Sequence, residues 1–264
     1  MALLNCKFHS NMLQVKTSMN VILPERTPGI IGKKTSVPAG TFPVLWLFHG
    51  LSDDENSWLR NTSIERYVDE YGIAVVMPDA QRSYYNDMAA GGRYWRFISE
   101  ELISKARSFF PLSHRREDNF VAGLSMGGFG AFKLALNRPE LVSAAGSFSG
   151  VVNILKRFDL QRGNPEEFAR MFGTPDVVRE SLNDLPWLLA KSKAEKIRLP
   201  HLYQCCGTED FLYQLNNSFL KTAQKSAVPI HYEEDPGFAH TWDYWDIKIQ
   251  TFLKWLVLQD LSES

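Results

Sequence analysis

The sequence has little cysteine and no long apolar run. Only Cys6, Cys205 and Cys206 among its 264 residues are cysteine, which excludes a disulfide framework and favours a reducing compartment. No apolar stretch approaches the roughly 20 residues that a membrane-spanning helix needs, and residues 1–12 lack the pattern of a signal peptide. We therefore expect a cytoplasmic protein with no membrane partner.

The sequence also lacks an excess of charge and the usual cofactor motifs. The 29 lysines and arginines balance 30 acidic residues, so the net charge of −1 favours no nucleic-acid partner. Cysteines and histidines do not cluster at zinc-ligand spacing, and residues 127–130 (GGFG) do not complete a dinucleotide-binding pattern. We therefore expect neither a metal nor another cofactor.

Apolar runs alternate with helical patterns along most of the chain. Residues 44–48 and 73–77 are continuous apolar runs, which are typical of strands buried on both faces. Residues 6–13 and 14–23 alternate in character and predict an antiparallel strand pair at one edge. The order of the later segments, strand then helix, indicates a mostly parallel central sheet with helices on both faces. The fold class is thus α/β, and residues 1–264 are expected to form a single domain.

Three segments carry more specific expectations. The Pro/Gly-rich connection at 24–43 is expected to be a mobile surface loop. Residues 151–198 interrupt the alternation and predict an insertion over the active site, which leaves open whether it forms a lid or packs beside the sheet. One apolar helical face is predicted from Phe97, Leu102, Ile103, Ala106, Phe109 and Phe110.

A serine stands between two glycines where a predicted strand ends and a helix begins. The residues are Gly123-Leu124-Ser125-Met126-Gly127. In a strand-to-helix elbow, side chains at Gly123 and Gly127 would clash with neighbouring backbone, and the serine hydroxyl is exposed above the sheet. The pattern also fits a structural turn, so Ser125 needs partners before it is assigned as a nucleophile.

A serine nucleophile requires a base and an acid that orients the base. Asp210 and His240 follow later predicted strands, in the order serine, acid, histidine. Glu209 and Asp235 are alternative acids, and Asp210 is preferred. The histidines outside these loops are expected to be structural: His9, His114, His201 and His231.

An ester carbonyl also needs two N–H donors for its developing negative charge. Met126, directly after the serine, and Leu51, after the strand at 44–48, are predicted to supply them. His49 is expected to hold this loop by hydrogen bonding, and Gly50 allows its backbone to approach. Aromatic residues near strand ends are candidates for substrate contact, although they also fit a role in covering the core: Tyr84, Tyr85 and Trp242.

Five ordered blocks together resemble the esterase D family, and within it the bacterial tributyrin esterases. The blocks are residues 47–52 (LFHGLS), 56–59 (NSWL), 122–128 (AGLSMGG), 207–213 (GTEDFLY) and 240–242 (HTW). The resemblance implies an α/β-hydrolase fold, hydrolysis of short-chain acyl esters and a homo-oligomer, either dimer or tetramer. It also implies that Ser125, Asp210 and His240 occupy the triad positions, and Leu51 and Met126 the oxyanion positions.

The sequence therefore predicts a serine carboxylesterase that acts on small acyl esters through an acyl-enzyme intermediate. An S-formylglutathione hydrolase, a feruloyl esterase, or another thioesterase or acyltransferase remains an alternative with the same nucleophile. The stretch Leu51-Ser52-Asp53-Asp54 lacks the cysteine often found at this point in S-formylglutathione hydrolases. A catalytically silent binding protein with a hydrolase fold is an alternative of a different class.

Overall fold

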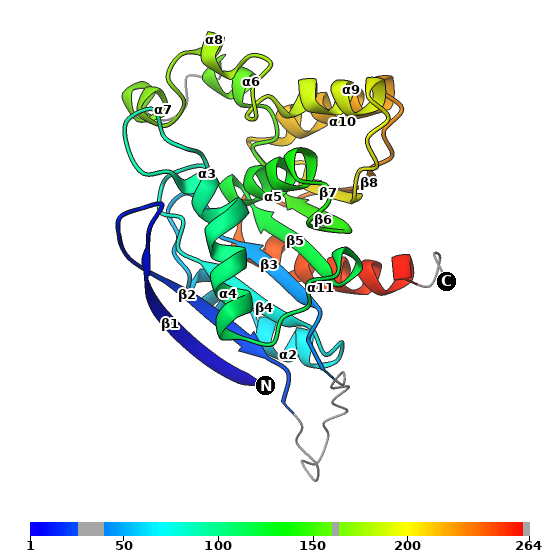
Figure 1. Cartoon of the computed structure of the whole chain (residues 1–264). Helices are drawn as coiled ribbons and strands as arrows, with labels where there is room; N and C mark the ends of the chain where they lie inside the picture. Colours follow the sequence, from blue (N-terminus) through cyan, green and yellow to red (C-terminus); the bar gives the residue numbers. More distant parts are fainter. Residues whose placement is uncertain (26–39, 160–163, 261–264) are drawn as a thin grey trace.

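A computed structural model describes residues 1–25, 40–159 and 164–260 (Figure 1). Most of the connection predicted at 24–43 lies outside these residues. Within them, eight strands form one sheet in the order β1-β2-β4-β3-β5-β6-β7-β8. The strands are β1 (Ala2–Ser10), β2 (Val15–Leu23), β3 (Val44–Phe48), β4 (Ala74–Pro78), β5 (Asn119–Leu124), β6 (Ala144–Phe148), β7 (His201–Gly207) and β8 (His231–Asp235). Strands β3 to β8 are parallel, and β1 and β2 form the expected antiparallel edge.

Helices cover both faces of this sheet (Figure 1). The face on which α11 (Trp242–Asp260) lies also carries α1 (Ser57–Asn61) and α2 (Ile64–Asp69), and the other face carries the remaining larger helices. These are α4 (Ile103–Phe109), α5 (Met126–Asn137), α9 (Leu185–Ala194) and α10 (Tyr213–Lys225).

Successive side chains of a strand point to opposite faces of the sheet, so the core has two layers. In β3, Trp46 and Phe48 join the cluster under α5, whereas Leu45 and Leu47 join the cluster under α11. All five residues of β3 are buried because a central parallel strand has a helix layer on each side. This explains why the sequence shows a continuous apolar run here rather than an alternating one.

The register brings the carboxyl ends of the central strands to one edge. Phe48 at the end of β3 pairs with Gly123 in β5, Leu124 pairs with Phe148 in β6, and Phe148 pairs with Cys205 in β7. The loops that follow these strands therefore begin side by side, which is where ligands bind in parallel sheets.

The prediction of one continuous apolar face over 97–110 was wrong at its end. A π-helical segment, η1 (Phe97–Leu102), lies between α3 (Tyr94–Arg96) and α4. The face continues into α4 through Ile103 and Ala106, but Phe109 is the last residue of that helix. Phe109 consequently has 50% of its surface exposed, whereas Leu102, Ile103 and Ala106 are buried.

The segment 151–198 divides into two structural parts. Its first part contains α6 (Ile154–Asp159), α7 (Pro165–Phe172) and α8 (Pro175–Val178), which lie together beyond the sheet at the upper left of Figure 1. Its second part is α9, which packs against α5 and α10. The first part alone therefore lies near the loops that follow the strands.

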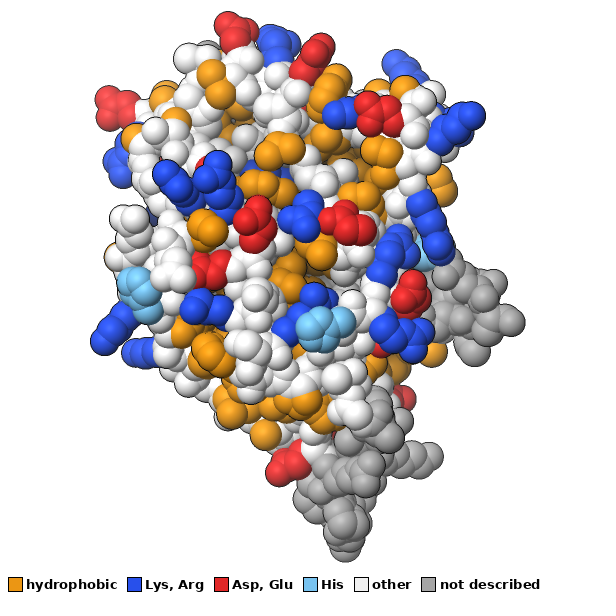
Figure 2. Space-filling view, in the orientation of Figure 1, with side chains coloured by type: hydrophobic (Ala, Val, Ile, Leu, Met, Phe, Trp, Pro, Cys, Tyr) orange, Lys and Arg blue, Asp and Glu red, His pale blue; other side chains and the backbone are white. Residues whose placement is uncertain are grey.

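Charged side chains of both signs are interspersed over the face seen in Figure 2, with no broad region of a single sign. This matches the balanced composition of the sequence. Of the helices in the described ranges, none is long and apolar enough to cross a membrane.

A buried lysine links α5 to the turn at residues 83–86. The Lys133 ammonium donates to the Tyr85 carbonyl and to Asn86 Oδ1, both at 3.0 Å, and lies 4.7 Å from the centre of the Trp95 ring. The lysine therefore fastens the turn to the core. Burial lowers the pKa of Lys133 from 10.5 to about 7, because the charged form is the more costly to desolvate.

Lys133 predicts a pH dependence of stability. Between pH 7 and 10.5 the unfolded chain retains a proton on this lysine that the folded protein loses, so this contribution to folding stability rises with pH. We expect the unfolding free energy of the wild type, minus that of Lys133→Met, to increase from pH 7 to 9. The increase is at most about 1.4 kcal/mol per pH unit. Denaturant titrations measure this difference, with Lys156→Met at an exposed lysine as the control. A difference that stays constant with pH would contradict the prediction.

Candidate active site

Ser125 sits in a strained turn between β5 and α5. Its φ of +52° is rare for a residue with a side chain, and its N–H donates to the Phe148 carbonyl at 2.9 Å. A Cβ on Gly127 would lie 2.7 Å from the His49 carbonyl oxygen, and one on Gly123 would lie 2.5 Å from the Gly127 backbone. Neither glycine has room for a side chain, because helix and strand backbones touch at this point. The elbow thus raises the serine hydroxyl above the end of the sheet.

Two hydrogen bonds connect Ser125 to His240 and Asp210. The His240 Nε2 lies 3.0 Å from the Ser125 Oγ, and its Nδ1 lies 2.8 Å from the Asp210 Oδ2. Asp210 is 4% exposed, and its other oxygen accepts the Leu212 N–H at 2.8 Å. These contacts favour the tautomer in which Nδ1–H donates to the carboxylate and Nε2 accepts from the serine. Three residues distant in sequence thus form one chain of hydrogen bonds.

The rival acids and histidines are placed elsewhere. Asp235 accepts from the Tyr244 hydroxyl and from the Lys248 ammonium, both at 2.7 Å, and Glu209 is exposed. The carboxylate that His240 contacts is that of Asp210. The four histidines expected to be structural are all exposed: His9, His114, His201 and His231.

His49 is buried in the loop formed by residues 49–54. Its Nδ1–H donates to the Gly50 carbonyl at 2.7 Å, and its Nε2 accepts the Ala80 N–H at 2.9 Å. Burial lowers the pKa of His49, an effect larger than the opposing influence of the Gly50 carbonyl and nearby carboxylates. A neutral imidazole with these two partners fastens the 49–54 loop to the loop that follows β4.

Further contacts that the sequence analysis did not identify hold the same loop. The Asp53 carboxylate accepts the Gly50 N–H at 3.1 Å, and the Trp58 ring N–H donates to the Phe48 carbonyl at 3.0 Å. Arg82 donates to the Leu51 carbonyl at 3.4 Å and forms a two-point ion pair with Glu167 of α7. The spacing of Asp53, three residues after Gly50 in a turn, is a signal that points to such a contact. The Arg82–Glu167 pair has no signal in the sequence, because it joins elements 85 residues apart.

A pocket of about 360 Å³ opens over Ser125. Its lining includes Ser125, His240 and Leu51, so the nucleophile, the histidine and the 49–54 loop face one space. Apolar side chains form much of the remaining wall, while Asp53 and Arg157 contribute charges of opposite sign. The Met126 N–H lies in the first turn of α5, whose amides have no acceptor within the helix. It is therefore available to a ligand held at Ser125.

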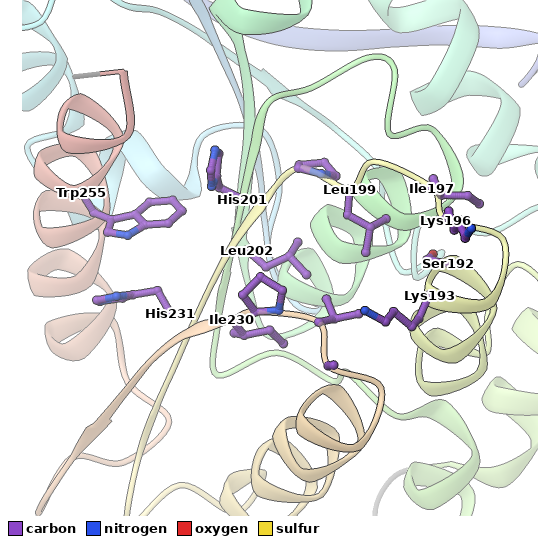
Figure 3. Close-up of a pocket in the computed structure, with 14 residues that line it drawn as sticks. Ser192, Lys193, Lys196, Ile197, Leu199, His201, Leu202, Ile230, His231 and Trp255 are labelled. Carbon is purple, nitrogen blue, oxygen red and sulfur yellow. The ribbon is translucent and has the colours of Figure 1, made fainter. Parts of the chain in front are cut away.

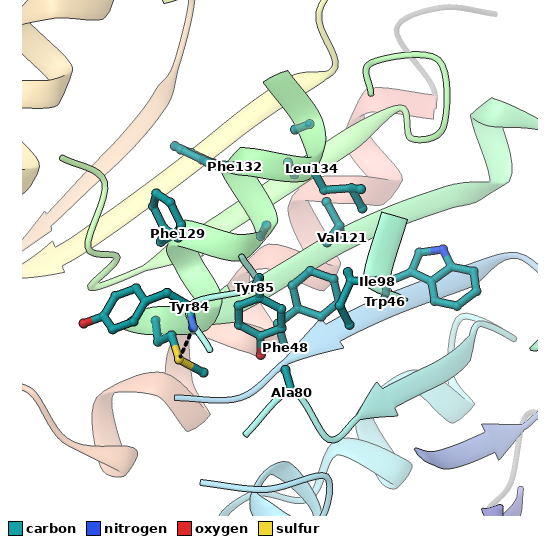
Figure 4. Packing of buried hydrophobic residues seen from close by; sticks show 14 of the residues in the cluster. Trp46, Phe48, Ala80, Tyr84, Tyr85, Ile98, Val121, Phe129, Phe132 and Leu134 are labelled. Atoms are coloured by element: carbon teal, nitrogen blue, oxygen red, sulfur yellow. Dashed lines mark hydrogen bonds between the residues drawn. The ribbon is translucent and has the colours of Figure 1, made fainter. Parts of the chain in front are cut away.

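The three aromatic candidates for substrate contact have different positions. Tyr84 and Trp242 line the pocket. Tyr85 lies beneath it instead, with its ring stacked on Phe48 at 4.6 Å and its hydroxyl donating to the His49 carbonyl at 2.9 Å. Figure 4 shows Tyr85 beside Phe48, and Tyr84 directed away from that pair with its N–H bonded to the Met126 sulfur. The expectation for Tyr85 is therefore corrected to support of the 49–54 loop, because successive residues of a turn point in different directions.

A larger cavity lies at the opposite edge of the sheet. It has a volume of about 730 Å³ and is lined by residues at the beginning of β7 and β8, among them His201 and His231, and by Lys193 of α9 (Figure 3). Parallel strands begin at the edge opposite to their carboxyl ends, so this cavity is remote from Ser125. The larger of the two cavities is therefore not the one that contains Ser125 and His240.

Comparison with known proteins identifies the family. Residues 10–256 match the model of the family described as "Putative esterase". The chain is 31% identical to an acetyl esterase of Caldicellulosiruptor saccharolyticus, with 97% of this chain and 98% of the relative covered.

Two solved structures from Staphylococcus aureus, each 36% identical, cover 97% of this chain and 98% of their own. They are the fluorophosphonate-binding serine hydrolase F, with a TM-score of 0.86, and an S-formylglutathione hydrolase, with a TM-score of 0.84. A ferulic acid esterase with 22% identity and a TM-score of 0.80 shares the fold. The chain therefore belongs to this esterase family of the esterase D type, and is a carboxylic ester hydrolase with the α/β-hydrolase fold.

Proposed function

We propose that the protein is a serine carboxylesterase that hydrolyses short-chain acyl esters through an acyl-enzyme. The observation that carries the proposal is the chain of hydrogen bonds from Ser125 through His240 to Asp210, at 3.0 and 2.8 Å, in the wall of the 360 Å³ pocket. These distances lie within the range at which a base takes the proton of a nucleophile.

In the proposed mechanism, the Ser125 Oγ attacks the ester carbonyl while His240 Nε2 takes its proton. The Asp210 carboxylate stabilises the resulting imidazolium and holds its orientation. The Leu51 and Met126 N–H groups donate to the carbonyl oxygen as it gains negative charge. His240 then gives the proton to the departing alcohol, which leaves an acyl group on Ser125. Water, deprotonated by His240, attacks this acyl group, and the acid is released as the proton returns to Ser125.

The pocket supports the preference for short acyl chains. Its volume lies at the low end of the range for small-molecule sites. Tyr84 is 2% exposed and packs edge-on against Phe168 and Phe172 of α7, both at 5.4 Å, so the wall behind it is filled. The acetyl esterase relative also acts on a small acyl group, as its name states.

Thioester hydrolysis is the second candidate function. The S-formylglutathione hydrolase of Staphylococcus aureus is 36% identical over nearly the whole of both chains. The same serine and pocket would accept a thioester carbonyl, since the acyl-enzyme is identical after the thiol leaves. Parallel assays with S-formylglutathione and with acetyl to octanoyl esters distinguish the two by kcat/KM.

The resemblance to the esterase D family extends the proposal to a cytoplasmic homo-oligomer, either dimer or tetramer. Sedimentation equilibrium of the purified protein measures the mass of the assembly. A monomer throughout the micromolar range would overturn this part of the proposal.

Replacing the nucleophile tests the mechanism directly. We expect Ser125→Ala to lower kcat for 4-nitrophenyl butyrate by at least about 10⁴-fold, because no other group forms the acyl-enzyme. A fluorescent fluorophosphonate should label the wild type and not the variant, which excludes a silent binding protein. Circular dichroism melting serves as the folding control. Ester turnover that survives in a folded Ser125→Ala protein would overturn the proposal.

Replacing Tyr84 in the pocket wall with a smaller residue tests the preference for short acyl chains. We expect Tyr84→Ala to raise kcat/KM for octanoyl relative to acetyl 4-nitrophenyl esters, because the removed ring leaves space for the longer chain. Tyr94→Ala is the matched control, since Tyr94 is also buried but does not line the pocket. An unchanged profile in Tyr84→Ala would show that this ring only supports the core.

A further inference from the structure

The pocket over Ser125 contains a cation that the proposed mechanism does not use. Arg157 of α6 lines the same space as Ser125 and His240. Hydrolysis of a neutral short-chain ester requires a nucleophile, a base and two N–H donors, and none of these roles needs a guanidinium. A guanidinium is a cationic group with five N–H donors and no acceptor.

Aromatic contacts hold Arg157 in position. The centre of the guanidinium lies 5.2 Å from the ring of Phe168, which packs edge-on against Tyr84 at 5.4 Å. Burial raises the pKa of Tyr84 to about 12, and the nearby charge of Arg157 partly opposes this effect. A stacked guanidinium presents its N–H groups outward in the plane of the fork. The side chain is half-buried between α7 and the pocket wall.

Two carboxylates in this region, those of Asp53 and Glu167, have other partners. Asp53 accepts the Gly50 N–H, and Glu167 forms the two-point ion pair with Arg82. Among residues whose side chains the structure describes, no carboxylate lies within ion-pairing distance of Arg157. The Tyr84 hydroxyl is a hydrogen-bond partner of Arg157, but a guanidinium has five N–H donors. A partly desolvated arginine in a substrate pocket therefore has further N–H groups to offer a ligand, for which a carboxylate is the matching acceptor.

From this arrangement we infer that the preferred substrate is a short ester carrying a carboxylate, which Arg157 binds while the ester carbonyl lies at Ser125. This inference rests on the proposed esterase function and makes Arg157 a specificity-determining residue. Apolar lining residues, including Val151, Leu212 and Trp242, accommodate the short hydrocarbon link between the two groups. The carboxylate belongs either to the acyl part or to the alcohol part of the ester.

Two matched pairs of esters test the inference and distinguish these sources. Monomethyl glutarate and methyl glutaramate differ only in a carboxylate or a carboxamide on the acyl part. The pair 4-acetoxybutanoate and 4-acetoxybutanamide places the same difference on the alcohol part. The measured quantity is the ratio of kcat/KM for the carboxylate to kcat/KM for the carboxamide. We expect the wild-type ratio to be at least about 10 in one of the pairs, as for a charge-assisted hydrogen bond.

Variants on α6 assign the preference to a residue. Arg157→Gln should lower the ratio by about tenfold or more, and Arg157→Lys should lower it less, because the lysine retains the charge without the fork. Lys156→Gln is the matched control, since Lys156 is exposed on the same helix and does not line this pocket. We expect it to keep the wild-type ratio. Melting curves confirm that each variant is folded.

The outcomes separate this inference from the proposed function. Three results would overturn the role of Arg157 while esters are still hydrolysed. They are a wild-type ratio near one in both pairs, an unchanged ratio in folded Arg157→Gln, and an equal fall of the ratio in Lys156→Gln. Failure of the esterase proposal itself would instead appear as turnover that does not depend on Ser125.

Discussion

The contact between the first turn of α5 and the end of β3 is the constraint on which the site depends. Gly127 lies so close to the Phe48 and His49 carbonyls that no side chain fits between them. At this approach Ser125 has a positive φ, and Met126 begins the helix. Strain of this kind costs about 1–3 kcal/mol and persists only where the surroundings impose it. Here the buried strands on both sides of β5 impose it.

Buried polar groups hold the loops around the elbow. His49 joins the loop after β3 to the loop after β4, and Tyr85 donates to the His49 carbonyl from below. Lys133 in turn binds the Tyr85 carbonyl from α5. Each group is desolvated, and each has the hydrogen-bond partners that a buried polar group needs. The result is a continuous support from the helix behind the serine to the loop that faces it, so the geometry of the site is set before a substrate binds.

The segment that follows β6 forms part of the pocket wall. Phe168 and Phe172 of α7 close the wall behind Tyr84, and Arg157 of α6 adds a positive charge. The Arg82–Glu167 ion pair connects α7 to the loop that contains Leu51. Ser125, Asp210 and His240 therefore lie in loops at the ends of the strands, whereas the pocket walls come partly from a separate helical segment.

The sequence by itself determined the order of the strands and helices, the elbow and the pairing of Ser125 with Asp210 and His240. These follow from local rules: apolar runs mark strands buried on both faces, and such strands end at a common edge. Only the tertiary structure decided three other features. These are the exposure of Phe109, the different positions of Tyr84 and Tyr85, and the presence of Arg157 in the pocket. The end of α4, successive positive φ angles and contacts between distant segments produce them. Such features depend on how elements meet in space, which a linear pattern does not encode.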